Sequence, residues 1–183
     1  MSTNTQVHIR PARVGDAGAI LKLVNELAIQ QILLPRSPAS VIENIRDFHV
    51  AEVDGAFAGC AALHVVWSDL AEVRSIAIQP DHQRGGIGAA LMDHLVEEAE
   101  HMGIPRLFAF TYAQGFFEKM GFSVVPHGEL PHKVFKDCLH CPKFTACDEI
   151  AMERVLHEPD GPRQNFGVPV TSIPIPQKPQ RAP

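Results

Sequence analysis

The apolar residues of this chain follow two spacings, which predict strands and helices in alternation. Alternating or continuous apolar runs between turn residues predict strands at 7–10, 49–53, 56–67, 73–78, 106–111, 122–125 and 149–156. Apolar residues repeated every three or four positions predict helices at 16–32, 37–47, 88–102 and 116–120. The resulting order, β-α-α-β-β-β-α-β-α-β-β, indicates one mixed domain of the α+β class.

The clearest local signal is the glycine-rich loop Gln83-Arg84-Gly85-Gly86-Ile87-Gly88, between a predicted strand and a predicted helix. Its glycines let backbone N–H groups approach an anion closely, and the following helix adds the partial positive charge of its N-terminus. The loop therefore predicts a pyrophosphate site. It is not a Walker loop, because Ala89 and Ala90 follow the last glycine, and its glycine spacing differs from the dinucleotide-binding fingerprint.

The length and composition are those of one catalytic-sized domain. With 183 residues and 45% hydrophobic content, the chain can bury one full core but has no room for two typical domains. We expect this domain to span 1–157, with a cysteine-containing insertion at 126–147. Residues 158–183 are rich in proline and are expected to form a flexible tail.

Charge and hydropathy exclude two classes of partner. The net charge is -5, and the 16 Lys and Arg residues are scattered, whereas a nucleic-acid surface needs them clustered. The first residues lack the apolar segment of a signal peptide, and no stretch reaches the roughly 18 apolar residues of a membrane span. We therefore expect a cytoplasmic protein that binds neither nucleic acid nor membrane.

The pattern Gln83-x-x-Gly86-x-Gly88 after a strand resembles the acetyl-CoA motif of the GCN5-related N-acetyltransferases, the GNAT family. Residues 73–80 resemble the fourth strand of that family, and residues 116–122 resemble its late helix-to-strand signature. The resemblance implies the GNAT fold, with a central, mostly antiparallel mixed sheet of about seven strands flanked by about four helices. It also implies acetyl-CoA as the co-substrate.

A narrower resemblance covers four later blocks, at 111–117, 129–135, 138–144 and 147–152. Together they are similar to the short bacterial amino-acid N-acetyltransferases of arginine biosynthesis, which resemble the acetyltransferase part of N-acetylglutamate synthase. This implies acetyl transfer to the α-amine of glutamate, or of glutamine, by direct attack in a ternary complex. Because no amino-acid-kinase domain precedes these blocks, we expect the arginine-binding regulatory region of the long synthases to be absent.

The family resemblance also implies which residues contact acetyl-CoA. Backbone N–H groups on the strand that precedes the loop would face the acetyl and pantetheine portion, because that strand splays from its neighbour. The implied contacts are Ile76, Ala77, Ile78, Gln83, Arg84, Gly85, Gly86, Ile87, Gly88 and Phe117.

Acetyl transfer needs a base for the amine and an acid for the departing thiolate. Glu72, at the predicted start of the motif strand, occupies the position where many family members have the base, although a solvated charge at a strand entry is the plain alternative. Phe117 stands where the family commonly has tyrosine, and phenylalanine donates no proton. Tyr112, the one tyrosine of the chain, is therefore the candidate acid, with substrate binding or a structural role as alternatives.

An amino-acid acceptor brings carboxylates, which arginine binds in a bidentate manner. Arg74, together with its neighbour Ser75, is the first candidate for acceptor binding. Lys133, in the insertion, is the second candidate cation, and a solvated surface charge is its alternative.

The spacing Cys138-x-x-Cys141-x5-Cys147, with His132 and His140 nearby, is compatible with a structural zinc ion. Reduced thiols packed in a loop are the alternative, so we assign no metal ligand firmly.

Two classes of function remain open at this level. An enzyme that acetylates a small amino acid is favoured, with peptide N-termini and polyamines as other acceptors. A non-catalytic acetyl-CoA-binding or thiol-based regulatory module is the alternative. The sequence leaves open whether the chain forms a homodimer.

Overall fold

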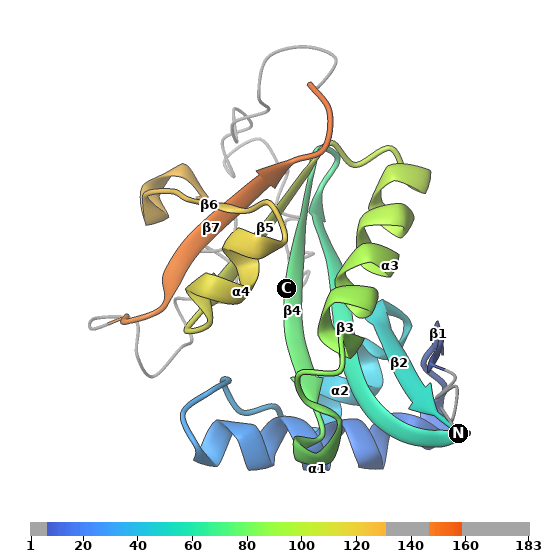
Figure 1. Cartoon of the computed structure of the whole chain (residues 1–183). Helices are drawn as coiled ribbons and strands as arrows, with labels where there is room; N and C mark the ends of the chain where they lie inside the picture. The colour runs from blue at the N-terminus through green and yellow to red at the C-terminus, as the bar shows by residue number, and fades with distance from the viewer. Residues whose placement is uncertain (1–6, 131–146, 159–183) are drawn as a thin grey trace, which may run out of the picture.

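The computed structural model describes residues 7–130 and 147–158, which form a seven-stranded sheet with helices on both faces (Figure 1). The strands are β1 (Val7–Pro11), β2 (Phe48–Val53), β3 (Ala56–Trp67), β4 (Leu70–Ile78), β5 (Arg106–Thr111), β6 (Ser123–Val124) and β7 (Ile150–Val155). The α-helices are α1 (Ala17–Ile29), α2 (Pro38–Glu43), α3 (Ile87–His101) and α4 (Gln114–Lys119). Short 3-10 helices lie at 14–16, 45–47, 80–82 and 127–129.

The strand order is β1-β2-β3-β4-β5-β7-β6, and within the described residues every strand pairing is antiparallel except that of β4 with β5. A parallel pair needs a crossover connection, which α3 supplies. The α+β class, the mostly antiparallel sheet, its seven strands and the four helices of the described part are confirmed.

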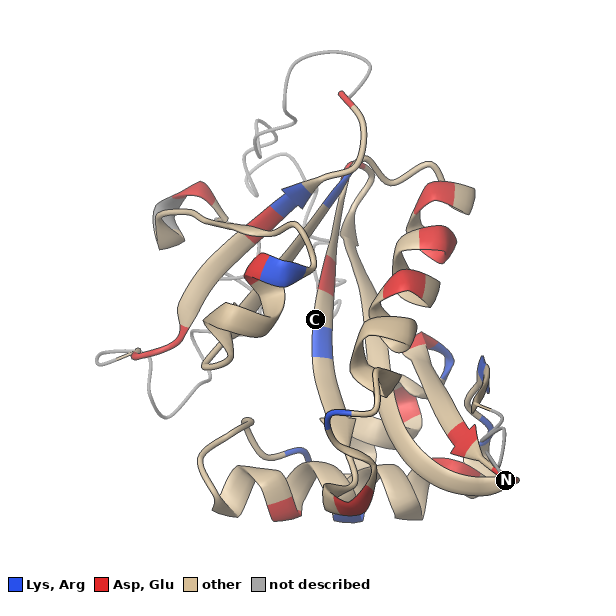
Figure 2. Ribbon diagram, viewed as in Figure 1, with Lys and Arg blue, Asp and Glu red and all other residues tan. Residues whose placement is uncertain are grey.

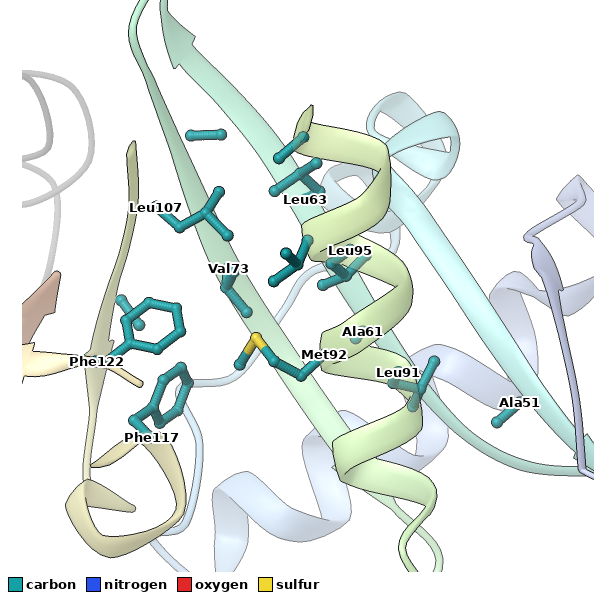
Figure 3. Close-up of a cluster of buried hydrophobic side chains, with 14 of the residues drawn as sticks. Ala51, Ala61, Leu63, Val73, Leu91, Met92, Leu95, Leu107, Phe117 and Phe122 are labelled. Carbon is teal, nitrogen blue, oxygen red and sulfur yellow. The ribbon is translucent and has the colours of Figure 1, made fainter. Parts of the chain in front are cut away.

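The two faces of the sheet carry separate apolar cores. On one face, α3 packs Leu91, Met92 and Leu95 against the strands, near Leu63 and Val73 (Figure 3). On the other face, α1 and α2 cover β2 and β3 with their own cluster. Because α3 is amphipathic, its acidic residues Asp93, Glu97 and Glu100 are exposed, while the described Lys and Arg residues are spread over several elements (Figure 2).

Several predicted boundaries are wrong, among them the end of the second helix, which stops at Glu43 and not at 47. The apolar spacing extended the first helix to Ile32, but α1 ends at Ile29 and Gln31 has a left-handed φ of 59°. The motif strand begins at Leu70 instead of Val73, so that Glu72 lies within β4. The error in the first helix arises because apolar spacing does not distinguish a residue of the core from one that lines a cleft. The error in the motif strand arises because Ser68 and Asp69 favour a turn, while the pairing of Leu70 with Arg106 starts the strand directly after them.

Two predicted segments fall largely outside the described residues. These are the proline-rich tail from residue 159 onward and residues 131–146 of the cysteine-containing insertion. Among the described residues, no helix has the length and apolar character needed to cross a membrane.

A buried histidine of β2 lies beneath α3. His49 of β2 is 4% exposed, its Nδ1 atom lies 3.5 Å from Oε2 of Glu98, and its ring contacts that of His94 at 4.6 Å between centroids. Burial, and then the nearby His94, lower the pKa of His49 from 6.5 to about 4. Burial, followed by the charge of Asp47, raises the pKa of Glu98.

We expect His49 to make the fold acid-sensitive. Between about pH 6.5 and pH 4 the unfolded chain binds a proton that the folded chain does not, so stability falls as the pH falls, by about 3 kcal/mol in total. The raised pKa of Glu98 acts in the opposite direction, because its penalty disappears on acidification. Denaturant melts of wild type and His49→Gln at several pH values, with His8→Gln as a control, measure the effect. An equal acid-induced loss in wild type and His49→Gln would contradict it.

Candidate functional site

The site is built on the divergence of β4 from β5. The two strands pair only from Leu70 with Arg106 to Glu72 with Phe108. Beyond this point they separate in a V, which Figure 1 shows between β4 and the β5–β7 pair. This is the separation of the two strands that the family resemblance implied. It leaves one edge of β4, after Glu72, open to a ligand.

A β-bulge bends β4 within this open stretch. Cys60 pairs with Ala77 and Ala62 pairs with Arg74, so that two residues of β4 oppose one of β3. Ser75, one of the two, has a left-handed φ of 55°. The bulge turns the strand at the point where it leaves β5.

A cleft of about 610 Å³ lies where β4 and β5 separate. The predicted acetyl-CoA contacts that line it are Ile76, Ile78, Gln83, Arg84, Gly86, Ile87, Gly88 and Phe117. The described lining does not include two others, Ala77 and Gly85. Ala77 instead packs in the core beneath α1. The cleft wall is mostly apolar, with the glycine loop at one end.

The glycine loop folds into the start of α3. Gly86 is the N-cap, with a left-handed φ of 81°, and α3 begins at Ile87, one residue before the predicted start. The Nε2 of Gln83 donates to the carbonyl of Ile78 at 3.2 Å, which fixes the loop against the end of β4. The first N–H groups of a helix have no partner within it, so this end of the cleft suits an anion.

Gly88 lies where the cleft is narrow. A Cβ atom on Gly88 would meet the ring of Phe116 at 3.4 Å and Cγ1 of Ile78 at 3.9 Å. We expect Gly88→Val to place two further methyl groups in the cleft and to raise KM for acetyl-CoA at least about tenfold. Steady-state kinetics measure this. Gly18→Val is the matched control, because Gly18 is also the second residue of its helix and has nothing within 4 Å. Equal effects of both variants would contradict the expectation.

A smaller recess of about 60 Å³ adjoins the cleft through shared lining residues. Its charged lining consists of two arginines and two glutamates, Arg36, Arg74, Glu72 and Glu149. Two cations and two carboxylates in a small space complement a zwitterion, because arginine binds a carboxylate and glutamate binds an ammonium group.

Sequence reasoning missed Arg36. Its backbone is held on α1 by Asn25, whose Oδ1 accepts from the Arg36 N–H at 2.9 Å and whose Nδ2 donates to the Arg36 carbonyl at 3.1 Å. Its side-chain Nε donates to Oγ of Ser75 at 3.3 Å. No local spacing marks this arginine, because the residue that it meets on the bulge is 39 positions away.

Glu72 is buried, with 3% of its surface exposed. Nη1 of Arg74 lies 3.8 Å from its Oε2, and Nη2 of Arg74 lies 3.5 Å from Oδ2 of Asp47. The same oxygen of Asp47 lies 2.5 Å from Nδ1 of His64. The burial excludes the alternative of a solvated strand-entry charge. The role of Glu72 as a base stays a prediction.

The candidate acid is less well placed. Phe117 is buried between Phe116 and Phe122, at ring-centroid distances of 5.4 and 5.1 Å, and offers no proton. The hydroxyl of Tyr112 donates to Oδ1 of Asp148 at 2.8 Å. Thr111 and Ala113 line the cleft, whereas Tyr112 itself is not among the described residues that line it. Its role as the acid stays a prediction.

Several predicted residues are not described. Lys133, Cys138 and Cys141 lie outside the described residues, and Cys147 is exposed. Within 7–130 and 147–158, no three His, Cys, Asp or Glu side chains are grouped as metal ligands. The structural zinc site and the role of Lys133 therefore stay predictions.

Known proteins of similar sequence and structure indicate the family of this chain. Residues 25–122 match the model of the acetyltransferase (GNAT) family. The chain is 38% identical to an uncharacterised N-acetyltransferase of Chlorobaculum tepidum over 81% of this chain and 96% of that protein. It is 36% identical to the amino-acid acetyltransferase of Mycobacterium tuberculosis over 70% of this chain and 75% of that protein.

A solved structure is also similar. It is N-acetylglutamate synthase from Neisseria gonorrhoeae, complexed with coenzyme A and N-acetyl-glutamate, with a TM-score of 0.75 and 34% identity. The match covers 85% of this chain and 36% of that one, so the chain corresponds to little more than a third of the longer synthase.

Proposed function

The chain belongs to the acetyltransferase (GNAT) family, and from that premise we propose that it transfers acetyl from acetyl-CoA to the α-amine of an amino acid, with glutamate as the preferred acceptor. It is thus an acetyl-CoA-dependent amino-acid N-acetyltransferase. The product would be N-acetylglutamate, the product of the first step of arginine biosynthesis.

The cleft supports the binding of acetyl-CoA. Its glycine loop and the start of α3 suit the pyrophosphate, and the open edge of β4 beyond Glu72 offers backbone groups to the amides of the pantetheine arm. The apolar wall suits the arm itself. The thioester would then lie near the bulge at Ser75, where the cleft meets the recess.

The recess carries the proposal for the acceptor. Arg36 and Arg74 line the recess and would pair with the carboxylates of an amino acid, and the buried Glu72 would face its amine. Such an arrangement holds the amine at the end of the cleft where the thioester would lie. Orientation of this kind accounts for much of the rate of a two-substrate reaction.

The reaction follows from these positions. Glu72 accepts a proton from the amine, directly or through water. The neutral nitrogen forms a bond to the thioester carbon and releases its second proton to solvent as the carbon–sulfur bond breaks. The thiolate takes up a proton, for which Tyr112, reprotonated from solvent, is the candidate donor. Direct attack is favoured over an acyl-enzyme on Cys60, because burial raises the pKa of this thiol to about 12.

The test is thiol release from acetyl-CoA with glutamate, glutamine, other amino acids, a polyamine and a peptide N-terminus, scored as kcat/KM for each acceptor. The highest value for glutamate is expected, as the Neisseria complex with N-acetyl-glutamate suggests by similarity. A preference for glutamine would retain the reaction and change the acceptor. Tight binding of acetyl-CoA without turnover of any amine would overturn the proposal in favour of a regulatory module.

A further inference from the structure

Asp47 is the last residue of the 3-10 helix that leads into β2, and sequence analysis gives it no role. A single oxygen, Oδ2, lies 2.5 Å from Nδ1 of His64 and 3.5 Å from Nη2 of Arg74. Asp47 is not among the described residues that line the recess. It therefore stands behind Arg74, as seen from the recess.

Arg74 is placed between two carboxylates. Its side chain is 9% exposed, with Glu72 on the Nη1 side and Asp47 on the Nη2 side. Charges at such low exposure are screened less by solvent than surface charges are. A carboxylate of the acceptor that approaches Arg74 thus meets a cation already shared by two anions.

The charges around the recess are unequal in number. Arg36 and Arg74 are positive, whereas Glu72 and Glu149, together with Asp47 behind them, are negative. The ring of His64, which is paired across β3–β4 with Glu72, contacts Asp47. Within this described set, Asp47 is the acidic residue that contacts a recess cation from outside the recess.

Glutamate and glutamine have nearly the same shape and differ by one negative charge. We propose that Asp47 is a specificity-determining residue that weakens the hold of Arg74 on an acidic acceptor side chain relative to its neutral isostere. The proposal rests on the proposed function, because it assumes that an amino acid occupies the recess. A residue that only supported the fold would affect both acceptors alike.

The expected change in the relative affinity for glutamate and glutamine follows from Coulomb's law. Asp47 is separated from the acceptor by a guanidinium group, and one charge at roughly 8 Å in a largely aqueous dielectric changes relative affinity about three- to fivefold. Asp47→Asn keeps the size of the side chain and an oxygen acceptor for the ring of His64. It removes the charge and replaces the second oxygen with an NH2 group.

The experiment compares kcat/KM for glutamate with kcat/KM for glutamine in wild type, Asp47→Asn and Asp47→Glu. We expect Asp47→Asn to raise the glutamate-to-glutamine ratio about three- to fivefold, less at high salt, and Asp47→Glu to bring it back toward wild type. The matched control is Asp16→Asn, whose carboxylate pairs with Arg10 at 2.8 Å and is 18% exposed, against 25% for Asp47. An unchanged ratio in Asp47→Asn, or the same change in Asp16→Asn, would overturn the proposal.

Calorimetric titration of each amino acid into the complex with coenzyme A measures the ratio of affinities for glutamate and glutamine without turnover. A higher ratio of affinities in Asp47→Asn supports the proposal even if wild type proves inactive, and in that case only the proposed reaction fails. A ratio of affinities that does not change, or no binding of either amino acid, overturns the role of Asp47.

Discussion

Replacing Glu72 with glutamine is expected to lower kcat by a factor of about 100 to 1,000 and to leave KM for acetyl-CoA unchanged, because a positioned base contributes an effect of this order. Glutamine matches glutamate in size but accepts no proton from the amine. Arg74 retains its contact with Asp47, so we expect the local fold to persist.

The pH dependence separates a lost base from a damaged fold. The deficit of Glu72→Gln is expected to shrink at high pH, where the free amine in solution is already neutral and needs no base. Initial rates of thiol release at several pH values measure this. Glu52→Gln is the control, since Glu52 is a strand carboxylate bonded to an arginine, Arg10, at 2.6 Å on the β1–β2 pair at the edge of the sheet. Wild-type turnover by Glu72→Gln at every pH would remove Glu72 from the mechanism.

Arg36→Ala is expected to lower kcat/KM for the amino acid about 10- to 100-fold, because a hydrogen bond to a charged group is worth about 1.5–3 kcal/mol. KM for acetyl-CoA should change little, since Arg36 lines the recess and is not among the described residues that line the cleft. Arg36→Lys should restore only part of the loss, because lysine keeps the charge without the planar fork.

Arg46→Ala is the control for Arg36. Arg46 is exposed and lies in the 3-10 helix at 45–47. It is not among the described residues that line the recess. KM is measured separately for acetyl-CoA and for the amino acid, by varying one substrate at a time. Equal increases in KM for both substrates in Arg36→Ala would indicate a folding defect and would contradict a role in acceptor binding.

The elements of the fold were predictable because their signals are local. Asp54-Gly55 favours a tight turn, and the structure has a hairpin with β2 and β3 on its two sides. The glycine loop predicted the start of a helix, which begins at Ile87 with Gly86 as its N-cap. Each signal depends on the backbone of a few neighbouring residues.

Ile32 shows where local signals end. Its spacing fits the apolar face of α1, but the chain turns at Gln31 and Ile32 lines the cleft instead of the core. An apolar residue favours removal from water equally well in either place. Only the arrangement of β4, β5 and the α1–α2 connection distinguishes them.

The amino-acid sequence alone was enough for the strand and helix order, the glycine loop and the family resemblance that points to acetyl-CoA. It also identified Glu72 and Arg74 but not their surroundings. The burial of Glu72, the place of Arg74 between two carboxylates and the convergence of Arg36 and Asp47 on this strand arise from tertiary contacts. Arg36 meets Ser75 across 39 positions and Asp47 meets Arg74 across 27. Sheet pairing and helix packing create these neighbours, and no pattern within a few residues encodes them.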